Sequence, residues 1–126
     1  MIERDWSDKV ILIAEDEQIN FVFLKAVFKH TGATILEAKN GREAIEICKD
    51  QDHDIDIILM DIKMPDIDGL EATKEIKKIH PDIFVIAQTA YTFKEDQDRA
   101  EEAGCDDFLA KPIRPVNLLA IVDKYL

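Results

Sequence analysis

Short apolar runs alternate with segments of helical spacing along this chain. Val10–Ala14, Ile55–Met60 and Ile83–Ala87 are continuous, rich in β-branched residues and bounded by polar positions. Runs of this kind predict strands that are buried on both faces. Thr34–Ala38 and Asp107–Ala110 are weaker candidates for two further strands.

Apolar residues recur every three or four positions between these runs, which predicts a helix after each strand. Asn40 is placed to cap the second helix, and the third ends at His80-Pro81. Gly32 and Gly104 are expected to stop the first and the fourth. The five helices are expected at about 19–27, 40–48, 70–79, 93–103 and 116–122.

Strand and helix alternate five times, which indicates an α/β fold of the doubly wound (βα)5 type. Its strands are parallel, and its right-handed crossovers place helices on both faces of the sheet. We expect one domain over residues 10–126, preceded by an N-terminal extension or linker stub at residues 1–9. Ligands of open α/β sheets bind at the carboxyl ends of the strands, so the functional residues are sought there.

Charge and composition narrow the range of functions. The net charge of −11, with no basic stripe, disfavours direct binding of nucleic acid. No apolar run is long enough to span a bilayer, and the start lacks a signal-peptide core, so we expect a cytoplasmic chain without membrane contact. If the chain is excised from a larger protein, it would be the cytosolic domain of a membrane-bound parent. Cys48 and Cys105 are too few for a disulfide scaffold.

Chemically active side chains follow four of the five predicted strands. Glu15-Asp16-Glu17 follows the first, Asp61 ends the third, Gln88-Thr89-Ala90 follows the fourth and Lys111-Pro112 follows the fifth. Because these ends share one edge of a parallel sheet, the side chains are expected to meet. Carboxylates packed together repel one another, and a divalent cation held by oxygen ligands, best Mg²⁺, relieves the repulsion.

This arrangement suits phosphoryl transfer to a carboxylate. A carboxylate can attack phosphorus and form an acyl phosphate. Asp61 is the expected nucleophile because it ends a buried central strand and precedes a turn-rich loop. Mg²⁺ and Lys111 would stabilise the charge on the transferred group, and the Thr89 hydroxyl would donate a hydrogen bond to it.

The same residues carry a family resemblance over residues 9–126. The chain resembles response-regulator receiver domains of two-component systems in four stretches taken in order. The sequence of residues 103–108 (AGCDDF) further resembles receivers of hybrid sensor histidine kinases. The four stretches are Val10–Glu17 (VILIAEDE), Ile58–Gly69 (ILMDIKMPDIDG), Thr89-Ala90 and Lys111-Pro112.

The resemblance implies a fold, a reaction and a cofactor. The fold would be flavodoxin-like, with strand order 2-1-3-4-5. Asp61 would be phosphorylated in a Mg²⁺-dependent reaction, from the phosphohistidine of a sensor histidine kinase or a histidine phosphotransfer domain. The chain would catalyse its own phosphorylation and dephosphorylation without being a conventional turnover enzyme. A downstream output protein is a further possible partner.

The resemblance also assigns roles to individual residues. Asp16 and Asp61 would contact the metal directly, Glu15 more often through water, and the Lys63 carbonyl would complete the protein ligands. Thr89 and Lys111 would bind the phosphoryl group, and the Lys111-Pro112 bond would be cis.

Five positions are expected to affect the metal site or the behaviour of the phosphorylated form. Glu15 stands where Asp is frequent, so its reach to the metal is longer. Lys63 and Tyr91 occupy positions that flank the attacking water, where they could slow hydrolysis of the acyl phosphate. Thr89 and Phe108 would form the switch that alters the surface of the fourth helix, fifth strand and fifth helix.

Four other interpretations fit the sequence less well. A haloacid-dehalogenase-like phosphatase requires Asp-x-Asp after the first strand, and a flavodoxin requires a neutral phosphate loop there. A calcium loop over Asp50–Asp56 lacks its turn glycine, because Ile55 occupies that position. A receiver fold without chemistry would lack an acid, the Thr or the Lys, all of which are present.

Overall fold

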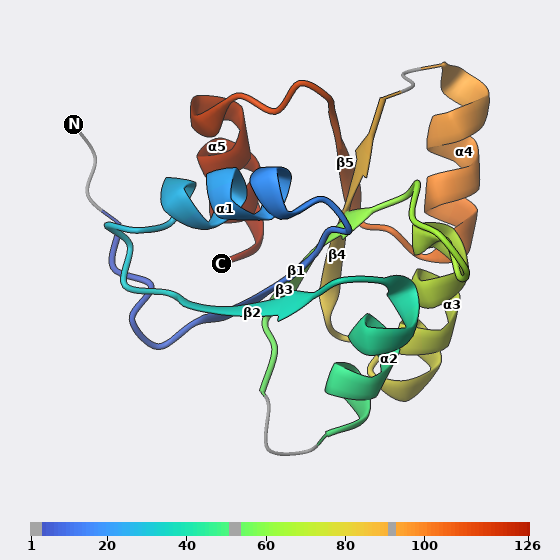
Figure 1. The fold of residues 1–126 in the computed structure, drawn as a ribbon, viewed down its shortest axis with the longest axis horizontal. Coiled ribbons are helices and arrows are strands. Elements are labelled where there is room, and N and C mark those ends of the chain that lie inside the picture. The colour runs from blue at the N-terminus through green and yellow to red at the C-terminus, as the bar shows by residue number, and fades with distance from the viewer. Residues whose placement is uncertain (1–3, 51–53, 91–92) are drawn as a thin grey trace.

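The apolar runs form one parallel sheet in the computed structural model, which describes residues 4–50, 54–90 and 93–126 (Figure 1). Within these residues the strand order is β2-β1-β3-β4-β5, and every neighbouring pair is parallel. The predicted fold class and strand order are confirmed. The strands are β1 (Val10–Ala14), β2 (Thr34–Ala38), β3 (Ile57–Asp61), β4 (Phe84–Thr89) and β5 (Asp107–Ala110).

Helices cover both faces of the sheet, with α1 and α5 on one side and α2, α3 and α4 on the other (Figure 1). Two apolar clusters correspond to these layers. Ile11, Ile13 and Leu59 face α1 and α5, whereas Leu12 and Met60 face the opposite layer, as alternation along a strand requires. The helices are α1 (Gln18–Val27), α2 (Gly41–Lys49), α3 (Gly69–Ile79), α4 (Lys94–Ala103) and α5 (Pro115–Tyr125).

Most of the predicted helix ends are confirmed. The Asn40 side chain accepts a hydrogen bond from the Glu43 amide at 2.8 Å, and Gly104 ends α4 in the left-handed conformation. Gly32 is the exception, because α1 already ends at Val27. The Thr31 hydroxyl donates to the Phe28 carbonyl at 2.7 Å, so a turn closes the helix before the glycine is reached. Gly32, with φ of +81°, serves the connection to β2 instead.

Residues 4–9, which we expected to form an extension or linker stub, lie against the domain. Trp6 is buried, its ring centroid lies 6.2 Å from that of Phe28, and its amide donates to the Thr31 carbonyl at 2.7 Å. Arg4 forms an ion pair with Asp123 of α5 at 3.5 Å. The segment therefore ties the end of α1 to α5.

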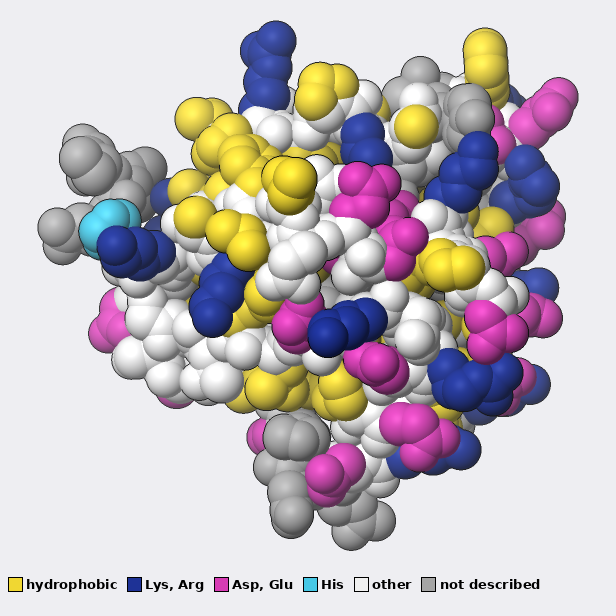
Figure 2. All heavy atoms as spheres, in the orientation of Figure 1, with side chains coloured by type: hydrophobic (Ala, Val, Ile, Leu, Met, Phe, Trp, Pro, Cys, Tyr) yellow, Lys and Arg dark blue, Asp and Glu magenta, His cyan; other side chains and the backbone are white. Residues whose placement is uncertain are grey.

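The surface is mixed in charge, and hydrophobic side chains gather on one part of it. Figure 2 shows hydrophobic side chains gathered over α1 and α5, and the exposed large apolar residues include Ile19, Val22 and Phe23 of α1 and Val116 of α5. In the described part of the chain, every helix is too short or too polar to cross a membrane.

Candidate functional site

The ends of β1, β3, β4 and β5 bring the predicted site residues to one edge of the sheet. Ala14 pairs with Met60, so Glu15 lies beside Asp61. Asp61 pairs with Gln88, and Thr89 pairs with Ala110, which precedes Lys111. Residues far apart in the sequence thus become neighbours through strand register.

Three carboxylates converge at this edge. Glu15, Asp16 and Asp61 each offer an oxygen, and these oxygens lie within 4.8 Å of one another. Glu15 and Asp61 are almost fully buried, with 1% and 3% of their surface exposed, whereas Asp16 is exposed. An open set of oxygen ligands suits Mg²⁺, which binds through one or two carboxylates and keeps several waters. The donor set therefore fits the ion that the sequence predicts.

Electrostatics explain why this cluster favours a cation. Burial first, and then the charge of Asp61, raise the pKa of Glu15 from 4.5 to about 7, although Lys111 and hydrogen bonds oppose the shift. The Lys111 ammonium lies 3.1 Å from Asp61 Oδ1, and the Lys63 amide donates to the same oxygen at 3.2 Å. Without a metal, two effects reduce the repulsion in the site: Glu15 binds a proton more readily than an exposed glutamate does, and Asp61 pairs with Lys111.

The loop after Asp61 is packed against the strand end by a glycine. The Gly69 amide donates to the Ile62 carbonyl at 2.8 Å, so the chain returns to the strand it left. A Cβ at Gly69 would clash with the Asp61 carbonyl oxygen and with the backbone of Ile62. Asp68 then caps α3 by accepting from the Glu71 amide. Gly69 is therefore required for the close approach that fixes the backbone of Asp61.

A cavity of about 360 Å³ opens beside Asp61 and is also lined by Lys63, Thr89 and Lys111. Thr89 is buried and Lys63 is exposed. The Lys111-Pro112 peptide bond is cis. The cavity is thus shared by Asp61, by the Lys111 ammonium that pairs with it and by Thr89.

The remaining predicted residues lie near or outside this cavity. Phe108 pairs with Ala87 in the sheet and is half-buried against the cluster beneath α2, α3 and α4. Tyr91 lies outside the described residues.

Two amide side chains at the site were assigned no role from the sequence, although Gln88 was noted at the end of the fourth strand. Asn20 of α1 donates to Glu15 Oε1 at 3.4 Å. Gln88 is 1% exposed and ends an otherwise apolar run in β4. Its signal in the sequence was a polar amide at the end of a buried strand, where an apolar residue would be expected.

Comparison with known proteins gives the same family as the residues. The sequence model of the response regulator receiver domain family matches residues 11–123. The polar-differentiation response regulator DivK of Brucella anthropi is 33% identical over 120 residues, which cover 94% of this chain and 96% of that protein.

Two solved structures are similar over nearly the whole chain. The receiver domain of a sensor histidine kinase from Pseudomonas aeruginosa has a magnesium ion coordinated in its active-site cleft. It is 30% identical, with a TM-score of 0.84, and the match covers 93% of this chain and 96% of that one. The receiver domain of Ssk1 from Saccharomyces cerevisiae was solved with the histidine phosphotransfer protein Ypd1. It is 28% identical, with a TM-score of 0.83, and the match covers 99% of this chain and 89% of that one. The family match over most of the sequence and the shared fold show that this chain belongs to the response regulator receiver domains of two-component systems.

Proposed function

We propose that this receiver domain accepts a phosphoryl group on Asp61 from a phosphohistidine. A carboxylate oxygen of Asp61 attacks phosphorus and forms a P–O bond as the P–N bond to the donor imidazole breaks. The imidazole leaves with the electron pair of that bond and takes up a proton. The product is an acyl phosphate on Asp61.

The residues around Asp61 provide the groups that this transfer needs. Lys111 leaves its ion pair with Asp61 and binds a phosphoryl oxygen, and the Thr89 hydroxyl donates to another. Glu15, Asp16, Asp61 and the Lys63 carbonyl would hold Mg²⁺, which, when bound, neutralises charge on the phosphoryl oxygens. The same groups then serve hydrolysis of the acyl phosphate, and we propose that Lys63 and Tyr91 slow this hydrolysis.

One observation carries the proposal. Asp61 is 97% buried yet lines a cavity, and its carboxylate stands between an ammonium at 3.1 Å and two other carboxylates. A buried acid that meets a cation and other acids beside a cavity is the kind of group from which functional sites are built.

Phosphorylation would be read out on the face formed by α4, β5 and α5. Thr89 is the last residue of β4, and Phe108 lies in the adjacent strand β5. Movement of Thr89 toward the phosphoryl group would free room into which the half-buried Phe108 ring can turn. The bistable element is therefore the pair of Thr89 and Phe108.

The donor we propose is a sensor histidine kinase or a histidine phosphotransfer domain in the cytoplasm, and this chain acts either as a stand-alone regulator or as the receiver of a hybrid kinase. A related receiver was solved with such a phosphotransfer protein. The exposed Ile19, Val22 and Phe23 on α1, whose first turn follows the acidic cluster, offer that partner an apolar contact (Figure 2).

Labelling of the protein by acetyl phosphate or binding of beryllofluoride, followed by mass spectrometry or by NMR, tests the proposal. The wild type should be labelled only with Mg²⁺, and Asp61→Asn should not be labelled. Asp54→Asn, which changes an exposed acid elsewhere in the domain, is the matched control and should be labelled normally. Equal labelling of Asp61→Asn and the wild type would show that the acceptor has been assigned wrongly.

A further inference from the structure

Gln88 belongs to a row of buried polar side chains that crosses three adjacent strands. Ile13, Leu59 and Ile86 face the α1–α5 layer. Side chains two positions further along a strand face the same way, so Glu15, Asp61 and Gln88 follow them on that face. Asp61 occupies the middle of the row and has Lys111 as its partner.

The two outer members of the row carry polar atoms that no described residue satisfies. Glu15 Oε1 accepts from the Glu17 amide at 3.2 Å and from Asn20 at 3.4 Å. In contrast, Glu15 Oε2 and Gln88 Nε2 are buried, and neither has a hydrogen-bond partner in the part of the chain that the structure describes. One is an acceptor and the other a donor, so each can satisfy the other.

These two side chains line the same cavity, which has a volume of about 300 Å³ and is also lined by Lys111, Asn20 and Phe23. Their strands are separated by β3, so their backbones stand about 10 Å apart. Two extended side chains and one water molecule span such a distance. The cavity has the room and the polar partners that an ordered water requires.

We propose that Gln88 is a positioning residue for Glu15, and that its amide donates to the Glu15 carboxylate through water held in this cavity. The inference rests on the proposed function, because Glu15 matters only if it faces a bound metal. A glutamate has one more rotatable bond than an aspartate, so its carboxylate needs more restraint to point at an ion. Asn20 and the Glu17 amide hold one oxygen, and Gln88 would restrain the other.

A double-mutant cycle separates this role from simple packing. Gln88→Leu keeps the volume and removes the amide, and Glu15→Asp withdraws the carboxylate from its reach. Mg²⁺ binding by calorimetry should weaken about five- to tenfold on Gln88→Leu in the Glu15 background, as expected for one lost hydrogen bond. In the Glu15→Asp background, Gln88→Leu should change the affinity for Mg²⁺ by less than about twofold.

A second measurement uses the metal-free protein. Exchange of the Gln88 side-chain amide protons, followed by NMR, should be slow in the wild type and faster in Glu15→Asp. Equal exchange in the two proteins, or equal weakening of Mg²⁺ binding by Gln88→Leu in both backgrounds, would overturn the proposal and leave Gln88 as a packing residue. Gln88→Met repeats the cycle if Gln88→Leu folds poorly.

The proposed function can fail separately from this inference. If the coupling is found but acetyl phosphate labels no residue, Gln88 still positions Glu15 at a metal site, and only the phosphoacceptor assignment is lost. A different outcome is that the wild type is labelled normally on Asp61 while Gln88→Leu is labelled slowly even at saturating Mg²⁺. Gln88 would then act on the phosphoryl transfer itself and not through Glu15, which also contradicts the inference.

Discussion

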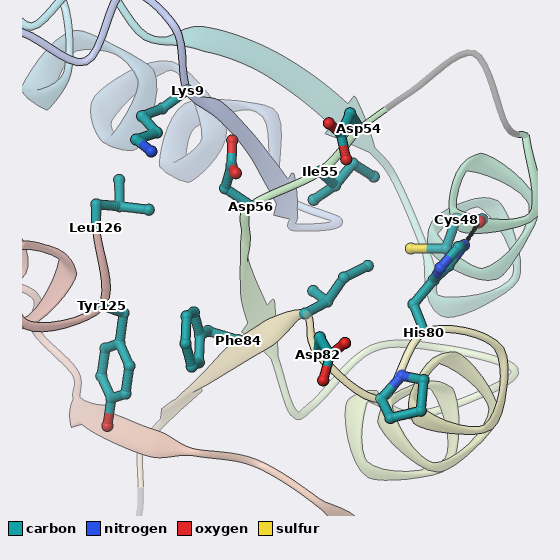
Figure 3. Close-up of a pocket in the computed structure, with 12 residues that line it drawn as sticks. Lys9, Cys48, Asp54, Ile55, Asp56, His80, Asp82, Phe84, Tyr125 and Leu126 are labelled. Atoms are coloured by element: carbon teal, nitrogen blue, oxygen red, sulfur yellow. Dashed lines mark hydrogen bonds between the residues drawn. The ribbon is translucent and has the colours of Figure 1, made fainter.

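The two ends of the sheet are both hollowed and both acidic, but they use their acids differently. The amino end has the larger cavity, about 470 Å³ against 360 Å³ beside Asp61. Figure 3 shows that it is lined by Lys9, Asp54, Asp56 and Asp82, which resemble in type the lysine and the acids at the carboxyl end. Cavity volume and number of acids therefore do not distinguish the two ends.

The difference lies in what the polar groups contact. At the amino end, Asp56 accepts from the Val10 amide at 2.8 Å, and the His80 ring points at the Cys48 carbonyl at 2.7 Å (Figure 3). Both side chains form hydrogen bonds with backbone groups, while Asp54 and Asp82 are exposed. At the carboxyl end, buried carboxylates face one another instead. Buried charges that converge, rather than a large cavity, identify the end of the sheet that can do chemistry.

The largest effect is expected when the lysine at the carboxyl end of the sheet is replaced, and the same replacement at the amino end serves as its comparison. Lys111→Met removes the cation beside Asp61 and should slow labelling by acetyl phosphate by about two orders of magnitude, as loss of one transition-state donor does. Lys9→Met removes a cation from the amino-end cavity and should leave the rate unchanged. The measurement is the initial rate of labelling at saturating Mg²⁺.

Comparable rates for the two lysine variants would remove the functional distinction between the ends. Far-ultraviolet circular dichroism of both variants serves as the control, because a loss of rate is informative only in a folded protein.

A smaller effect is expected in the stability of the metal-free protein. Burial and the charge of Asp61 raise the pKa of Glu15 to about 7, above its ordinary value of 4.5. The folded state therefore binds this proton more tightly than the unfolded state. This contribution to stability is complete below pH 4.5 and is lost as the pH rises through about 7.

Urea unfolding with a chelator should detect this dependence. Between pH 5 and pH 8, the free energy of unfolding of the wild type should fall by about 1–3 kcal/mol more than that of Glu15→Gln, whose side chain cannot ionise. Mg²⁺ should restore stability at pH 8 in the wild type because it binds only the folded state. Parallel pH profiles for the two proteins would mean that burial and the charge of Asp61 do not raise the pKa of Glu15.

The sequence predicted most of the fold because short buried strands leave a strong pattern. The bounds of β1, β2 and β5 agree with the predicted runs. In contrast, β3 begins at Ile57 rather than Ile55, and β4 extends to Thr89. Ile55 is buried without joining the sheet, so hydrophobicity alone could not show where pairing begins.

The site was predicted in part for a similar reason. The rule that ligands meet at the carboxyl ends of parallel strands brought Asp61 and Lys111 together without coordinates. It could not show that Gln88 lies on the same face as Glu15, because that depends on the register of β3 against β4. The absence of a hydrogen-bond partner for Gln88 is likewise a property of packing and not of the order of residues.

The smallest effect on function is expected for a polar side chain that only forms a hydrogen bond with the backbone. Asp56→Ala leaves the partly buried Val10 amide without the carboxylate that accepts from it and should lower the free energy of unfolding by about 1–2 kcal/mol. Because Asp56 lies at the end of the sheet away from Asp61, the rate of labelling by acetyl phosphate should stay at the wild-type value. Urea unfolding and labelling of the same sample measure the two quantities. A slower rate without loss of stability would show that the amino end influences the chemistry, and the contrast between the two ends would then be wrong.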